Sequence, residues 1–245
     1  MSPKTLLLAA IVLAIPSLFL ARIPMQADLW YISVIAILLF GAPVIVYTIR
    51  WLGARTGLLL IAALGVYALA FETIAIKTGL PYGNFAYTGL LGPKLFDATP
   101  VTVLLAWTPL VLGVLAILQT IKPLWRQALY ATIALVVIDM VFDPAAVHVG
   151  FWRWEEAGVY YGVPLVNFVG WIVSGGIAIS AVIYAKHRWQ WPAIPTLLGW
   201  NLLAIIFLWT MVNFFAVQLI PAAIGTVICS LLYWKLSTKA GLNKV

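Results

Sequence analysis

The chain has little charge and almost no cysteine. Charged residues make up 9% of its 245 residues, seven residues are acidic, and Cys229 is the single cysteine, so no internal disulfide can form. The sequence also lacks the glycine-rich phosphate loops GxGxxG and GxxxxGK[ST] and the GxSxG nucleophile elbow. Nucleotide-driven and serine-hydrolase chemistry are therefore disfavoured.

Apolar residues dominate instead, at 64% of the chain, and the mean hydropathy is +1.09. Repeated apolar runs of about 20 residues predict one polytopic membrane domain over residues 1–245. The spans should be α-helices, because the runs lack the alternation of a β-barrel, so the predicted fold class is an all-α helical transmembrane bundle. We predict eight spans, at residues 5–21, 29–50, 56–76, 99–120, 124–143, 164–185, 193–212 and 218–235.

The distribution of positive charge supports the eighth span and sets an orientation. With eight spans, ten of the fourteen lysines and arginines fall on one side and four on the other, whereas seven spans give seven on each side. The positive-inside rule then places both termini in the cytoplasm and suits a multi-pass protein of the plasma membrane. The first span could instead be a cleaved signal peptide, but SLFLA before Arg22 lacks small residues at both cleavage positions. The net charge of +7 requires no nucleic acid, because cytoplasmic loops face anionic lipid headgroups.

All seven acidic residues fall in the outer half under this topology. They are Asp28, Glu72, Asp97, Asp139, Asp143, Glu155 and Glu156. Acidic residues contribute little to orientation, so their one-sided placement indicates a polar site near the outer interface. Two long outer loops, 77–98 and 144–163, frame this site, and their glycine, proline and aromatic content predicts compact loops that dip back as a lid.

Asp139 and Asp143 are the first candidates for chemistry, because they share one helix face one turn apart. An ionised carboxylate in mid-membrane costs about 2.5–3.5 kcal/mol, so such residues usually carry function. An alternative is a solvated or capping role at an interfacial helix end. The same carboxylates and Glu72 are Mg²⁺ ligand types, although DxxxD is also ordinary helix spacing, and we expect no metal. His148 and His187 fall on opposite sides of the membrane, which excludes a closed zinc site with Cys229.

Aromatic residues crowd the same outer half. Six of the twelve tryptophans lie at predicted span ends, as an interfacial belt requires, but Trp107 and Trp171 lie inside spans. An aromatic face beside a carboxylic acid suits chemistry through a carbocation, which a ring stabilises by about 2 kcal/mol when desolvated. Core packing is the alternative role for each ring.

These motifs resemble the carotenoid biosynthesis membrane proteins of the CruF type, which include bisanhydrobacterioruberin and γ-carotene hydratases. The similarity covers residues 67–175, and the other spans match only in hydropathy. It joins Glu72, TGLPYG at 78–83, LGP at 91–93, DMVFDP at 139–144, GFWRW at 150–154 and GVYYGVPLVNFVGW at 158–171.

The resemblance implies the addition of water to the terminal C=C of an acyclic carotenoid end, giving a tertiary alcohol. We expect Asp143, Asp139 and Glu72 to divide the acid and base roles, with His148 as a further candidate for activating water. The residues expected to bind substrate are Tyr82, Trp107, Trp152, Trp154, Tyr160, Tyr161, Asn167 and Trp171. Hydration is redox-neutral, so no cofactor is expected.

The implied substrate is lycopene, γ-carotene or a bacterioruberin precursor, taken from membrane lipid, and other enzymes of carotenoid biosynthesis are expected partners. Three alternative functions stay open at this point. A purely structural membrane scaffold is one, and it would leave the one-sided placement of the acidic residues unexplained. A carotenoid end-group cyclase would use the same protonation but exclude water. A proton-coupled transporter would need acids along a path through both halves of the membrane, whereas the cytoplasmic half offers only neutral polar groups such as Asn201.

Overall fold

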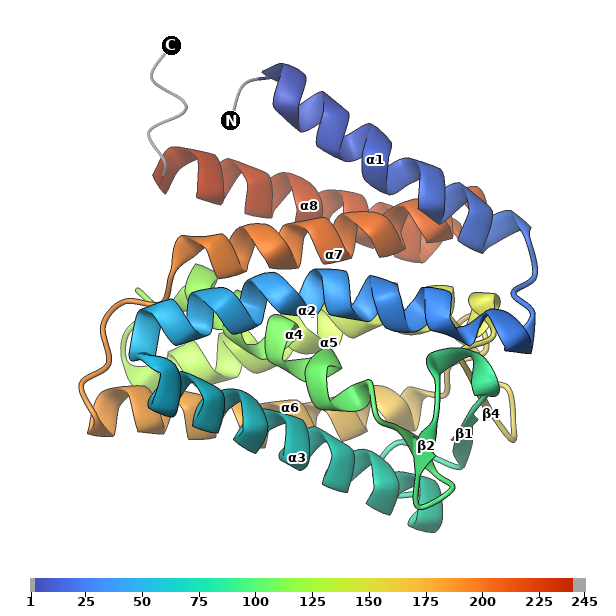
Figure 1. Cartoon of the computed structure of the whole chain (residues 1–245), viewed down its shortest axis with the longest axis horizontal. Helices are drawn as coiled ribbons and strands as arrows, with labels where there is room; N and C mark the ends of the chain where they lie inside the picture. Colours follow the sequence, from blue (N-terminus) through green and yellow to red (C-terminus); the bar gives the residue numbers. More distant parts are fainter. Residues whose placement is uncertain (1–2, 240–245) are drawn as a thin grey trace.

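The computed structural model describes residues 3–239, and these form a bundle of eight α-helices with four very short strands at one end (Figure 1). The helices are α1 Pro3–Arg22, α2 Trp30–Leu52, α3 Ala54–Thr78, α4 Val103–Leu118, α5 Leu124–Val149, α6 Leu165–Arg188, α7 Thr196–Phe215 and α8 Leu219–Lys239. Six of them, α2, α3 and α5 to α8, are long and apolar enough to cross a membrane. The all-helical fold class is therefore confirmed, and α7 and α8 are separate helices as predicted. The predicted total of eight crossings stays a prediction, because α4 and the apolar part of α1, Leu8–Arg22, are shorter.

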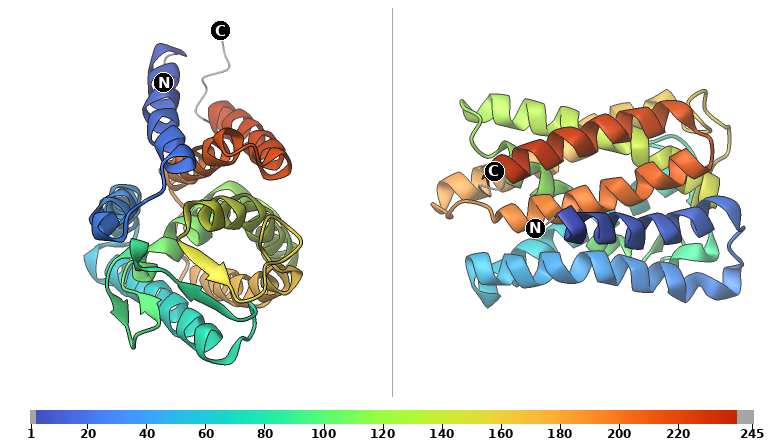
Figure 2. Two further views of the ribbon diagram at one scale, coloured as in Figure 1. Left: turned by 90° about the vertical axis from the view of Figure 1, so that its right-hand side faces the viewer. Right: turned by 90° about the horizontal axis from the view of Figure 1, so that it is seen from above.

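The helices run along a common direction, and α4 lies at the centre of the bundle (Figures 1 and 2). α4 packs against α2, α3, α5 and α7 and is buried along most of its length. Gly65 of α3 allows one close contact, because a Cβ atom there would lie 2.5 Å from the backbone oxygen of Leu104. Close packing of this kind, through small residues, is how membrane helices associate without a hydrophobic driving force between them.

α5 differs from the prediction in one respect that matters for the site. We predicted a span ending at Asp143, but the helix continues through Pro144 to Val149. Proline has no N–H, so Pro144 leaves the carbonyl of Met140, four residues earlier, without its helical donor. The Tyr160 hydroxyl supplies that donor at 3.0 Å, which lets the helix pass the proline. Asp139 and Asp143 therefore lie within a helix, and residues 144–149 are not part of the following loop.

The two long connections, residues 79–102 and 150–164, lie at the same end of the bundle, which we name the loop end. There β1 Phe85–Tyr87 pairs antiparallel with β4 Trp152–Trp154, with Phe85 opposite Trp154 and Tyr87 opposite Trp152. A second pair joins β2 Lys94–Leu95 to β3 Thr99–Pro100, and two short 3₁₀ turns, Ala27–Leu29 and Gly89–Leu91, complete this end. The first residues of α1 and the last of α8 lie at the opposite end (Figure 1). The two loops predicted to act as a lid thus bind each other through backbone hydrogen bonds.

Candidate active site

Asp139 and Asp143 form a buried pair on the face of α5 that packs against α6. Their side chains are 3% and 4% exposed, and their carboxyl groups are hydrogen-bonded to each other. Two carboxylates cannot form such a bond, because neither has a donor, so one proton must lie between them. The i, i+4 spacing within one helix fixes this contact.

Asn167 holds the two carboxyl groups in place. Its Nδ2 donates to Oδ2 of Asp139 at 2.8 Å and to Oδ2 of Asp143 at 2.5 Å. Asn167 lies in the first turn of α6, where Pro164 starts the helix and accepts the Asn167 backbone N–H. The amide is 3% exposed, so both of its side-chain N–H donors are used inside the protein.

Glu72 is the third buried carboxyl group and comes from α3. It is 6% exposed and accepts hydrogen bonds from the Tyr87 hydroxyl and the Trp107 indole N–H. Burial raises the pKa of Tyr87 well above its ordinary value, and the charge of Glu72 raises it further. Tyr87 therefore stays protonated and acts as a donor, which leaves Glu72 as the acceptor in both bonds.

Tyr82 connects the first long loop to α6 beside these carboxyl groups. Its hydroxyl donates to the Ser174 hydroxyl at 2.6 Å, and its backbone carbonyl accepts the Trp154 indole N–H at 2.9 Å. Gly170 makes room for the ring, because a Cβ atom there would lie 2.3 Å from a Tyr82 ring carbon. Burial raises the pKa of Tyr82 above its ordinary value, with the nearby Glu72 as the next cause. The hydroxyl is thus a neutral, fixed group in the wall of the site.

Trp107 and Trp171 stack with ring centroids 4.7 Å apart and an angle of 16° between their planes. Tyr67 meets the edge of this pair at Trp107, and Tyr82 lies 6.4 Å from Trp171. Because Trp107 also donates to Glu72, the stacked rings lie directly beside a carboxyl group. This arrangement places π-electron density next to a carboxyl group, where it can stabilise a positive charge.

The carboxyl groups and the stacked rings line one cavity of about 660 Å³. Its polar groups are concentrated where Glu72, Asp139, Asp143 and Asn167 meet, and the rest of its wall is almost entirely apolar. The apolar wall comes from α1, α2, α4 and α7. A pocket of this kind, apolar with a few convergent polar groups, is typical of a binding site for a small hydrophobic molecule. Nine of the twelve sequence-predicted site residues line it: Glu72, Tyr82, Trp107, Asp139, Asp143, Trp152, Trp154, Asn167 and Trp171.

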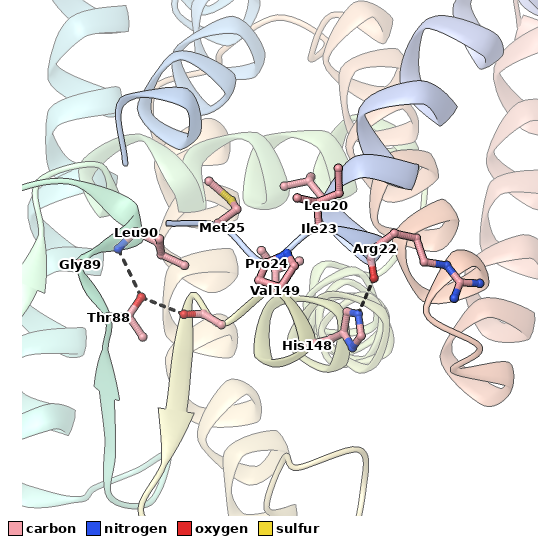
Figure 3. Close-up of a pocket in the computed structure, with 12 residues that line it drawn as sticks. Leu20, Arg22, Ile23, Pro24, Met25, Thr88, Gly89, Leu90, His148 and Val149 are labelled. Carbon is pink, nitrogen blue, oxygen red and sulfur yellow. Dashed lines mark hydrogen bonds between the residues drawn. The ribbon is translucent and has the colours of Figure 1, made fainter. Parts of the chain in front are cut away.

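The structure does not bring the other three candidates into this cavity. His148 lines a second cavity of about 520 Å³ at the loop end, and its Nε2 lies 2.9 Å from the carbonyl oxygen of Ala21. Figure 3 shows its ring directed at the end of α1. Tyr160 binds the Met140 carbonyl, and Tyr161 accepts the backbone N–H of Ile220 at 3.3 Å. All three side chains are thus bonded to groups outside the site cavity.

Sequence reasoning missed Tyr87, which binds Glu72 directly. The signal was present in Phe85-Ala86-Tyr87, where alternation places the two aromatic rings on the same, buried face of a strand. The apolar lining contributed by α1, α2 and α7 was also missed. Among residues 3–239, no group of three or more His, Cys, Asp or Glu side chains is placed to hold a metal ion.

Comparison with known proteins places these features in a family. The carotenoid biosynthesis protein family matches residues 32–232. The bisanhydrobacterioruberin hydratase of Haloarcula japonica is 33% identical over 189 residues, which cover 74% of this chain and 64% of that relative. This chain therefore spans somewhat less than two thirds of the relative's length. No solved structure matches. The family match covers most of the chain, including every residue of the carboxylate site, and so the protein belongs to the carotenoid biosynthesis protein family.

Proposed function

We propose that the protein adds water to the terminal C=C of an acyclic carotenoid end group and so forms a tertiary alcohol. The observation that carries this proposal is the buried carboxyl pair of Asp139 and Asp143, which Asn167 holds inside an apolar cavity that also holds Glu72. An alkene is a weak base, and a buried carboxylic acid without competing water is suited to protonate it. A relative named as a hydratase supports the same reaction.

The first step is protonation of the alkene by the Asp139–Asp143 pair. The proton is added to the less substituted carbon, the π bond breaks, and a C–H bond forms. The positive charge is left on the tertiary carbon, and the carboxyl pair becomes more negative by one charge. That negative charge and the faces of Trp107 and Trp171 stabilise the cation in a site that excludes bulk solvent.

The second step is attack of water on the tertiary carbon. Oxygen forms the new C–O bond, and Glu72 accepts the proton that water loses, because it is placed as an acceptor by Tyr87 and Trp107. Transfer of that proton from Glu72 back to the aspartate pair restores the starting state. The net reaction consumes one water and changes no oxidation state of the protein, so these residues need no redox cofactor.

Expression in cells that accumulate an acyclic carotenoid tests this proposal. We expect a new pigment heavier than the substrate by one water, measured by mass spectrometry. A new pigment of unchanged mass would instead indicate end-group cyclisation, because cyclisation rearranges bonds without adding atoms. If no acyclic carotenoid is converted, the hydratase proposal is wrong.

We also propose that the loop end faces outward across the plasma membrane and that both termini are cytoplasmic. The turns at the opposite end, residues 53, 119–123 and 189–195, lie beside most of the cationic residues, as the positive-inside rule requires of a cytoplasmic face. In a Cys229→Ala background, a membrane-impermeant thiol reagent should label Val159→Cys in intact cells and leave Gln190→Cys unlabelled. Both positions are exposed, so access to the reagent is the only difference intended. The reverse pattern would show that the orientation is inverted.

A further inference from the structure

The site cavity continues from the carboxyl groups to the space between α1 and α2. Eleven of its lining residues belong to these two helices: Val12, Leu13, Pro16, Phe19, Leu20, Ile32, Ser33, Ala36, Ile37, Leu39 and Phe40. Ten of the eleven are apolar, and Ser33 is buried with its hydroxyl directed at the sulfur of Met25. This branch of the cavity can accept hydrocarbon and offers nothing to a charged ligand.

The branch reaches the outer surface of the bundle. Leu39 and Val12 both line the cavity and are 69% and 58% exposed, and Phe19 and Ile32 are exposed as well. A side chain that lines a cavity and is also largely exposed marks the place where the cavity opens. On α2 the opening extends from residue 32 to residue 39, about 10 Å at 1.5 Å per residue. The opening therefore runs along the apolar half of α2 that is nearer the loop end, from its first turn to its middle.

Helix packing explains the gap. α1 packs chiefly on α7, whereas α2 packs on α3, α4 and α7. In the end-on view of Figure 2, α1 and α2 stand apart and are connected at the loop end by the chain before α2. The two helices thus form separate sides of an opening, with α4 and α7 at its back.

On the side of Glu72, the described part of the loop end is closed to a long hydrocarbon. The paired strands β1 and β4 cover it, and Phe85, Tyr87 and Trp154 are each less than 10% exposed. Their rings pack on one another, with Phe85 5.5 Å from Tyr87 and 5.9 Å from Trp154. A long hydrocarbon would have to break this cluster to reach Glu72 from that side.

We infer that the gap between α1 and α2 is a lateral portal through which the end of a linear polyene passes from the bilayer to the carboxyl groups, while the remainder of the chain stays in the apolar branch or in lipid. The inference rests on the proposed function for the choice of a polyene. The portal itself rests on the lining, the exposure of that lining and the covered loop end.

Photocrosslinking tests the portal without relying on turnover. A benzophenone amino acid placed at Leu39 should capture carotenoid in pigment-accumulating membranes, and one placed at Leu38 should capture far less. Leu38 is the matched control, because it is the neighbouring leucine, is 48% exposed and does not line the cavity.

The Leu39 adduct should persist in the Asp143→Asn variant. Persistence of the adduct with no hydration by the unmodified protein would support the portal while refuting the hydratase proposal. Absence of an excess at Leu39 would overturn the portal, whatever the hydration result.

Blocking the opening provides the second measurement. Ala36→Trp adds a large ring at the lining and should lower carotenoid turnover, because the ring occupies part of the opening. Ala42→Trp makes the same change at an exposed position of α2 outside the cavity and should leave turnover near normal. Equal turnover of the two variants would contradict the portal.

Discussion

Asp143→Asn should lower carotenoid hydration by about 10²–10⁴-fold, the range for loss of a general acid. The amide is close in size to the carboxyl group and can still accept from Asn167, but it cannot share and release the proton that the Asp139–Asp143 bond requires. Insertion into the membrane should be unaffected, because the variant removes an ionisable group from a buried position. The measurement is hydroxylated pigment formed per unit of membrane-inserted protein.

Two variants control for this loss. Glu155→Gln neutralises a carboxylate on the exposed loop and should retain normal hydration. Tyr160→Phe removes the hydroxyl that binds the Met140 carbonyl, so it should lower the free energy of unfolding by about 1 kcal/mol with little change in turnover. Near-normal hydration by Asp143→Asn, together with an inactive Glu155→Gln, would move the chemistry from α5 to the loop.

Glu72→Gln should also lower hydration by about 10²–10⁴-fold, but by blocking a different step. In this variant the aspartate pair can still protonate the alkene, and the cation can return a proton to the pair. Substrate recovered from heavy water should therefore carry deuterium at its terminal alkene although little alcohol forms. Asp143→Asn should give neither alcohol nor deuterium in the recovered substrate.

The exchange result assigns the two roles. Deuterium in substrate recovered from Asp143→Asn, but not from Glu72→Gln, would show that Glu72 is the acid. Glu156→Gln is the matched control for Glu72→Gln, since it makes the same change at an exposed loop position and should behave as the unmodified protein. Normal alcohol formation by Glu72→Gln would remove Glu72 from the mechanism.

The helices could be predicted from the sequence because a run of apolar residues is a local property, and α2, α3, α6, α7 and α8 begin and end within a few residues of the predicted spans. The predicted span for α5 ended six residues too early, at Asp143, because a proline such as Pro144 usually ends a helix. The hydroxyl that compensates for it comes from Tyr160, which local pattern does not connect to Met140. The pairing of β1 with β4 could not be predicted either, because strands of three residues give almost no periodic signal in the sequence.

The candidate carboxyl groups could be chosen from the sequence alone, because their residue types are unusual in this chain. Buried carboxyl groups are rare in an apolar chain, so Asp139, Asp143 and Glu72 could be chosen before their surroundings were known. The apolar wall of the cavity could not be predicted. In the sequence, Val12 and Leu39 look like any other lipid-facing residues, and only the structure shows that they face the gap between two helices. His148 was chosen because of its residue type. It lies in the last helical turn of α5, and its side chain points at the end of α1, away from the carboxyl groups.

Isotopic labelling of the product oxygen tests most directly whether this site adds water. Membranes containing the protein and an acyclic carotenoid are incubated in ¹⁸O-labelled water under ordinary air, and separately in ordinary water under ¹⁸O₂. The carboxylate mechanism predicts that the tertiary hydroxyl takes its oxygen from water alone and that the Asp143→Asn variant forms almost none of this product. Label from O₂, or a hydroxyl that forms equally well without Asp143, would contradict it.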